Sequence, residues 1–250
     1  QLIMRRINMK NAIILASAMA LTSHVFADHH DESINLSGAM TTINVIAKSP
    51  SAYIDQLQNN TDMMSASGAL LAGACIAVSG NEVPGEMQVF NFYSSISAAL
   101  SGYEVQLSNA DMKNFISDLN DFRELKGWET SRVVMPYEGE LYDLFATRTL
   151  MINTDNPQTY IEAIAELKDA YHANGYEDIS LDVYQPIGSG EAPSDYQVTA
   201  VAPSLARLGE MFDELYSSSW AQEAFSAVAA SRSSIVSDKI YKCENVFQSM

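Results

Sequence analysis

Apolar positions in the second half of the chain change spacing in a regular order, which predicts alternating strands and helices. A β-branched and apolar run from Thr149 to Asn153 predicts a strand, and it stops just before Asn156-Pro157. An N-cap residue followed by proline predicts that a helix begins there. The expected helix then carries apolar residues at helical spacing, namely Tyr160, Ile161, Ile164, Leu167 and Tyr171.

The segment after this helix predicts four more elements in the same unit. We expect a strand over 179–184, a Gly-rich turn over 186–193, a strand over 196–201, a helix over 205–215 continued over 220–230, and a closing strand over 235–241. The order is therefore βαββαβ.

The first half of the chain repeats this order. Ser49-Pro50 is answered by Asn156-Pro157, so the predicted helix start recurs 107 residues later. The matching elements are strands over 42–47, 74–78, 87–93 and 130–135 and helices over 50–64 and 111–125. A period of this length is the size of a small domain, which predicts two tandem copies of one fold.

A βαββαβ unit folds as a four-stranded antiparallel sheet with both helices on one face, so the other face is bare. Strands such as 75–78 and 198–201 are nevertheless apolar at adjacent positions, which indicates burial on both faces. We therefore expect an α+β protein whose two sheets meet as a pseudo-dimeric α/β barrel. The expected boundaries are 41–135 for the first ferredoxin-like repeat, 136–146 for a linker, 147–242 for the second repeat and 243–250 for a C-terminal tail.

One segment carries a resemblance to known families. Ala202 to Leu208, running into Ser219 to Gln222, resembles the split second helix of NIPSNAP-like and antibiotic-biosynthesis-monooxygenase-like proteins, which belong to the dimeric α/β-barrel superfamily. The first copy departs from this pattern, with a short helical piece over 94–101 and no matching tryptophan. The resemblance implies a pocket between the sheets for a small aromatic or haem-like ligand, and a monomer that acts as a pseudo-dimer.

The N-terminus predicts export. An apolar run over 12–21 precedes Val25-Phe26-Ala27, which has small residues at the positions expected for cleavage, so residues 1–27 are typical of a secretory signal. Residues 28–40 are then a flexible acidic and His-containing tail. The run is about half the length that crosses a bilayer, so we expect a periplasmic or secreted protein without a membrane span.

The charge balance limits the partners. The chain has 14 Lys and Arg against 31 Asp and Glu, a net charge of −17. Such a field repels phosphate backbones and anionic lipids, so we expect neither nucleic acid nor a membrane surface as a partner.

Polar residues in the strands are the candidates for a ligand pocket. Asn and Tyr side chains can orient a phenolic ligand, and Asp182 can act as a base if burial raises its pKa. The alternative is that these residues lie at strand ends or in a hydrogen-bonded core. The candidate set is Asn91, Tyr93, Asn153, Asp182, Tyr184 and Thr199.

No cofactor is expected in the barrel. Haem, used by the chlorite-dismutase-like branch of the superfamily, needs an axial ligand, and the one histidine beyond the N-terminal tail is His172, near the end of a helix. A chain cleaved after Ala27 would begin Asp28-His29-His30. A free amine with a histidine at the third position can bind Cu(II) or Ni(II), although a solvated tail is the alternative.

Cys75 and Cys243 are the two cysteines of the chain. In the strand order 4-1-3-2 implied by the fold, Cys75 lies in one edge strand and Cys243 follows the opposite edge strand, so head-to-tail closure of the barrel would bring them together. We therefore predict a disulfide. The alternative is a buried free thiol at Cys75 and an exposed thiol at Cys243 that pairs between molecules.

Two functions fit these patterns. The favoured one is a module that binds a small apolar or aromatic ligand or an interaction partner; the alternative is a cofactor-independent oxygenase or isomerase acting on an aromatic or polyketide-like substrate. A hollow barrel with a buried, perturbed carboxylate would favour the enzyme, and a filled barrel would favour the interaction module.

Overall fold

The computed structural model describes residues 34–190 and 194–249. Its elements follow the predicted order in both halves, with additional breaks in the helices. In chain order they are β1 (Ala39–Ala47), α1 (Pro50–Gln58), α2 (Thr61–Ala66), β2 (Leu71–Ser79), β3 (Glu86–Tyr93), α3 (Ile96–Ser108), α4 (Ala110–Leu119), β4 (Arg123–Met135), β5 (Leu144–Asn153), α5 (Pro157–His172), β6 (Ser180–Gly188), β7 (Tyr196–Ala202), α6 (Leu205–Ser217), α7 (Ser219–Ser231) and β8 (Ser234–Gln248).

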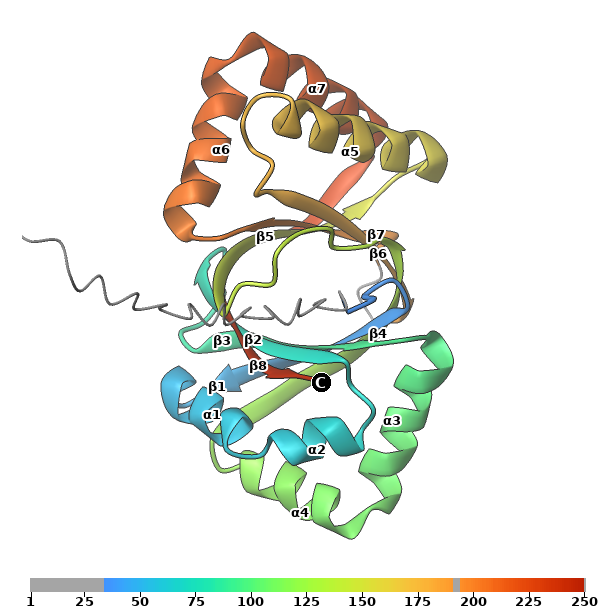
Figure 1. Cartoon of the computed structure of the whole chain (residues 1–250), viewed down its shortest axis with the longest axis vertical. Helices are drawn as coiled ribbons and strands as arrows, with labels where there is room; N and C mark the ends of the chain where they lie inside the picture. The colour runs from blue at the N-terminus through green and yellow to red at the C-terminus, as the bar shows by residue number, and fades with distance from the viewer. Residues whose placement is uncertain (1–33, 191–193, 250) are drawn as a thin grey trace, which may run out of the picture. The chain divides into compact units, whose positions relative to one another are not determined.

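The strands form one closed barrel in the order β1-β3-β2-β8-β5-β7-β6-β4. Each half contributes four strands in the predicted order 4-1-3-2, and the halves join at two antiparallel seams, β2 with β8 and β4 with β6. Helices α1 to α4 cover the outside of the first sheet and α5 to α7 cover the outside of the second (Figure 1). The predicted pseudo-dimeric α/β barrel is confirmed.

The internal repeat extends to the helix caps. Ser95 and Ser204, 109 residues apart, accept hydrogen bonds from the backbone N–H groups that open α3 and α6. Asn109 ends α3 and begins α4, just as Ser218 ends α6 and begins α7. The expectation that the first copy departs from the split-helix pattern is therefore wrong, because α3 continues to Ser108 and the split is present in both halves.

The expected segment boundaries need correction where strands pair across the halves. The segment predicted as a C-terminal tail, 243–250, is strand as far as Gln248, because the end of β8 pairs with β2 of the other half. The linker expected over 136–146 ends earlier, since β5 begins at Leu144. The helix expected over 111–125 stops at Leu119, and β4 begins at Arg123 against β1. Local sequence patterns do not contain these long-range pairings.

Alternate residues on each strand face two different environments. One face packs on the helices and forms two apolar cores, whose equivalent central residues Tyr53 and Tyr160 are both 0% exposed. The other face points into the barrel. Within the described residues, no helix is long and apolar enough to cross a membrane.

The predicted disulfide is present. Cys75 of β2 and Cys243 of β8 lie directly opposite each other, with a Cα–Cα distance of 4.0 Å and a bond between their sulfurs. Cys243 lies within β8 rather than after it. The bridge therefore covalently links one of the two seams between the halves.

Candidate functional site

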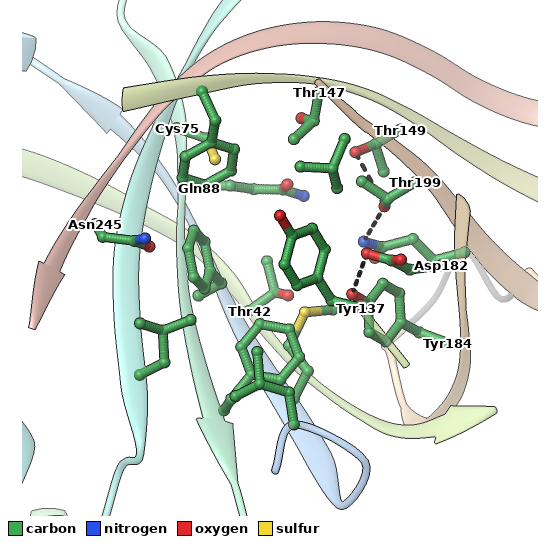
Figure 2. Close-up of a pocket in the computed structure, with 18 of the residues that line it drawn as sticks. Thr42, Cys75, Gln88, Tyr137, Thr147, Thr149, Asp182, Tyr184, Thr199 and Asn245 are labelled. Carbon is green, nitrogen blue, oxygen red and sulfur yellow. Dashed lines mark hydrogen bonds between the residues drawn. The ribbon is translucent and has the colours of Figure 1, made fainter. Parts of the chain in front are cut away.

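The barrel encloses a cavity between its two sheets. It offers about 80 Å³ of space to the centres of water-sized molecules, several times what a single water needs. Figure 2 shows side chains from both halves converging on this space. Those labelled are Thr42, Cys75, Gln88, Tyr137, Thr147, Thr149, Asp182, Tyr184, Thr199 and Asn245.

The cavity has one mainly apolar wall and one mainly polar wall. Phe90 and Phe92 of β3 line the side formed by the first half, together with Met40 and Leu71. The second half contributes a carboxyl, a phenol, an amide and hydroxyls, namely Asp182, Tyr184, Gln197, Thr147, Thr149 and Thr199. A ligand with an apolar body and a polar edge would satisfy both walls.

Asp182 is the most perturbed carboxyl on the polar wall. It is 1% exposed, Ser180 Oγ donates a hydrogen bond to its Oδ1, and Tyr184 OH donates to its Oδ2 at 3.2 Å. These three residues alternate along β6 and therefore share its inward face. Figure 2 shows the Tyr184 hydroxyl directed at the carboxyl.

Burial raises the pKa of Asp182 from 3.8 to about 7, because desolvation disfavours the charged form. The hydrogen bonds from Ser180 and Tyr184 oppose this change, as does the more distant charge of Lys168, while Glu138 reinforces it. The carboxyl therefore changes protonation state near neutral pH, which suits a group that accepts and returns protons.

A short chain of hydrogen bonds runs beside the carboxyl. Gln197 Nε2 donates to Thr199 Oγ1 at 3.3 Å, and Thr199 and Thr149 hydroxyls lie 3.4 Å apart (Figure 2). On the other side of the cavity, the buried Oδ1 atom of Asn245 has no hydrogen-bond partner among the described residues. A ligand hydroxyl or amine would supply the missing donor.

The segment between the two halves contributes to the cavity wall. Tyr137, Leu141 and Tyr142 line the cavity, although sequence patterns suggested only a linker there. The segment is held in place by β8, since Asn245 Nδ2 donates to the carbonyl of Tyr142 at 2.8 Å. Burial raises the pKa of Tyr137, so its hydroxyl stays protonated.

Three of the six predicted pocket residues line the cavity: Asp182, Tyr184 and Thr199. The other three do not. Asn91 and Tyr93 lie on the helix-facing side of β3, and Asn153 lies at the end of β5, where its Nδ2 donates to Ser234 Oγ at 3.1 Å. The error on β3 is one of parity, because inward and outward positions differ by one residue.

Sequence reasoning missed several cavity residues, and one signal would have found two of them. Gln88 and Gln197 are 109 residues apart, occupy the same place in the repeated hairpin and both line the cavity. Tyr137 and Tyr142 gave no such signal, because the segment between the copies has no counterpart in the repeat.

The described residues provide no evident metal site. No group of three or more His, Cys, Asp and Glu side chains in 34–190 and 194–249 is arranged to hold a metal ion. His172 lies on α5 outside the cavity lining, with its Nε2 2.8 Å from the carbonyl of Ile179, so the barrel cavity offers no histidine to haem. The Cu(II) or Ni(II) site at Asp28, His29 and His30 lies outside the described residues.

Comparison with solved structures identifies the fold. A proposed monooxygenase from Lactobacillus acidophilus has a TM-score of 0.58 and 9% identity over 84% of this chain and 95% of that chain. An anthrone oxidase-like protein has a TM-score of 0.54 and 12% identity over 85% and 95% of the two chains. A chlorite dismutase variant from Candidatus Nitrospira defluvii has a TM-score of 0.51 and 9% identity over 85% and 93%.

These likenesses show that the chain has the dimeric α/β-barrel fold, as its split helices suggested. No protein-family profile matches the sequence. No curated protein matches it either. The expectation of a protein without cofactor is corrected by the chlorite dismutase match, because this barrel is shared with the branch associated above with haem.

Proposed function

We propose that the protein is an enzyme that binds a small hydroxylated aromatic molecule in the barrel cavity and removes a proton from it, with Asp182 as the general base. The observation that carries the proposal is a fully buried carboxyl with a pKa of about 7 on the wall of a hollow barrel. A module that only binds its ligand has no need of such a group, and burying it is costly.

The two walls support an aromatic substrate. Phe90, Phe92 and Phe145 offer ring edges and faces, with Phe90 centroids 5.9 Å and 6.2 Å from the other two rings. The opposite wall offers the Asp182 carboxyl and the Gln197 amide to a hydroxyl or carbonyl group. The anthrone oxidase-like and monooxygenase neighbours are consistent with such a substrate class.

The proposed step is a proton transfer. The Asp182 carboxylate takes a proton from an acidic C–H or O–H bond, and the electron pair stays on the substrate as an enolate or phenolate. The product carboxylic acid is the form that the desolvated site favours, so burial drives this transfer forward. Return of the proton to another carbon completes an isomerisation, whereas dioxygen as oxidant would instead oxidise the same carbanion.

Anthrone is a suitable probe, because its methylene group is acidic and exchanges through a hydroxylated tautomer. We expect the protein to accelerate exchange of the methylene hydrogens in deuterium oxide, measured by NMR under nitrogen. The rate should rise with pH up to about 7 and then level off, since the base must be ionised.

Asp182→Asn should lower the exchange rate at least about 100-fold, the usual contribution of a positioned general base. Asp155→Asn is the matched control, because Asp155 is an exposed carboxyl in the loop before α5. Binding of anthrone with equal exchange in both variants would leave a binding module and overturn the enzyme proposal.

We also infer that the protein acts in the periplasm or outside the cell. The signal-like residues 1–27 and the Cys75–Cys243 disulfide support this location, since disulfides persist in oxidising compartments. Cell fractionation that places the full-length product in the cytoplasm would refute it.

A further inference from the structure

A second cavity lies in the first half, on the other side of the sheet from the barrel cavity. Val89 and Asn91 of β3 line it, whereas Gln88, Phe90 and Phe92 line the barrel. The second cavity offers about 50 Å³ to the centres of water-sized molecules, between the sheet and helices α1, α2, α3 and α4. It has no part in the function proposed above.

Three buried polar atoms on this cavity have no hydrogen-bond partner within the described residues. They are Nε of Arg123, Nε1 of Trp128 and Oε1 of Gln106. Buried polar groups in folded proteins are almost always hydrogen-bonded, so three orphaned atoms on one cavity point to a ligand that completes them.

Arg123 is the strongest of these signals. The residue is 5% exposed, and its Nη1 donates to the hydroxyl of Tyr53, which is neutral. In the described part of the chain, no carboxylate forms an ion pair with it. A buried guanidinium without a counter-charge is costly, and an anion in the cavity would offset that cost.

The second half lacks this arrangement. Ile43 and Leu150 are equivalent in the repeat; Ile43 pairs with Trp128, and Leu150 pairs with Asp238. Asp238 neutralises Arg148 through two hydrogen bonds, of 2.9 Å and 2.7 Å. Gln106 likewise corresponds to the apolar Leu215, 109 residues later. The orphaned cation, indole and amide of the first half are therefore not a general consequence of the fold.

The remaining lining is apolar. It includes three methionines and three other large side chains, which suit a flexible chain or a ring. These residues are Met63, Met64, Met112, Phe115, Ile116 and Leu119. The single guanidinium matches one negative charge better than two.

We propose that this cavity binds a small carboxylic acid with an apolar body, whose carboxylate lies against Arg123 and whose body lies among the methionines. Trp128 and Gln106 offer a donor and an acceptor to further polar groups of the ligand. Trp128 also reports occupancy, since it stacks on Tyr103 with ring centroids 5.5 Å apart.

The test uses the full chain with Trp220→Phe, in which Trp128 is the sole tryptophan. Octanoate and 3-phenylpropanoate are the acid probes, and octanamide is the uncharged match to octanoate. We expect a saturable change in indole emission with at least one acid, and at least tenfold weaker binding of octanamide than of octanoate, as expected for loss of a charge-assisted hydrogen bond. No saturable change with either acid, or equal affinity for octanoate and octanamide, overturns the proposal without any change at Arg123.

Two variants then assign the site. Arg123→Met should abolish the octanoate response while keeping a native circular dichroism spectrum, because it removes a buried charge and keeps the volume. Asp182→Asn should leave the response unchanged, since Asp182 lines the other cavity. A response that survives Arg123→Met, or one that Asp182→Asn removes, places the acid elsewhere and refutes this site.

Discussion

Asp182 and Gly73 occupy the same ladder position in the two halves of the barrel. Asp182 pairs with Thr199, Gly73 pairs with Phe90, and Thr199 and Phe90 are themselves equivalent in the repeat. The first half therefore places an aromatic ring over a glycine where the second half places a carboxyl beside a hydroxyl. This divergence produces the apolar and polar walls of one cavity from two copies of one unit.

The raised pKa of Asp182 makes the stability of the protein depend on pH. Its pKa is 3.8 when solvated and about 7 in the fold, so between these values the folded state binds more protons than the unfolded state. Stability should therefore fall as pH rises from 4 to 7, by up to about 1.4 kcal/mol per pH unit from this group. Urea unfolding of the parent and Asp182→Asn at pH 5 and pH 8 checks this, with the steeper decline expected in the parent.

Asp155→Asn serves as the control for that series, because Asp155 is exposed. Equal pH dependence of unfolding in the parent and Asp182→Asn would show that the carboxyl is not desolvated.

Tyr184 tunes this carboxyl. Its hydroxyl donates to Asp182 Oδ2 and thereby favours the charged form, so Tyr184→Phe should raise the pKa of Asp182 further. The pH at which anthrone exchange levels off should move upward. The titration of the Asp182 carboxyl, followed by carbon NMR, measures the change directly, and an unchanged or lower pKa would contradict the assignment of this hydrogen bond.

Gly73 is required by close packing rather than by its backbone angles. An added Cβ would meet the ring of Phe90 and would lie 2.7 Å from the carbonyl oxygen of Glu244. Gly73→Ala should therefore lower the free energy of unfolding by about 1–3 kcal/mol, the usual cost of overpacking. Adding Phe90→Leu should restore only part of the loss, because the Glu244 contact is with the backbone. Gly127→Ala is the control, since nothing lies within 4 Å of an added Cβ there.

The sequence contained enough to predict the barrel, because Pro50 and Pro157 mark equivalent helix starts and the strands need burial on both faces. It located the cavity less well. Asn91 was assigned to the wrong face of β3, since polar residues on both faces of a strand leave the parity open. The contribution of Tyr137 depends on how a segment without a repeat partner lies against β8, which is a long-range contact.

The Cys75–Cys243 bridge should stabilise the barrel chiefly at one seam. The halves meet along β2 with β8 and along β4 with β6, and the bridge links only the first of these pairs. The two cysteines are 168 residues apart, so the bond strongly restricts the unfolded chain. Cys75→Ala with Cys243→Ala should lower the free energy of unfolding by about 2–5 kcal/mol. Hydrogen exchange should rise first in the amides that join β2 to β8, while those that join β4 to β6 keep more of their protection. Equal loss of protection at both seams would mean that the bridge acts only through the unfolded chain, and unchanged stability in urea would contradict a structural role for the disulfide altogether.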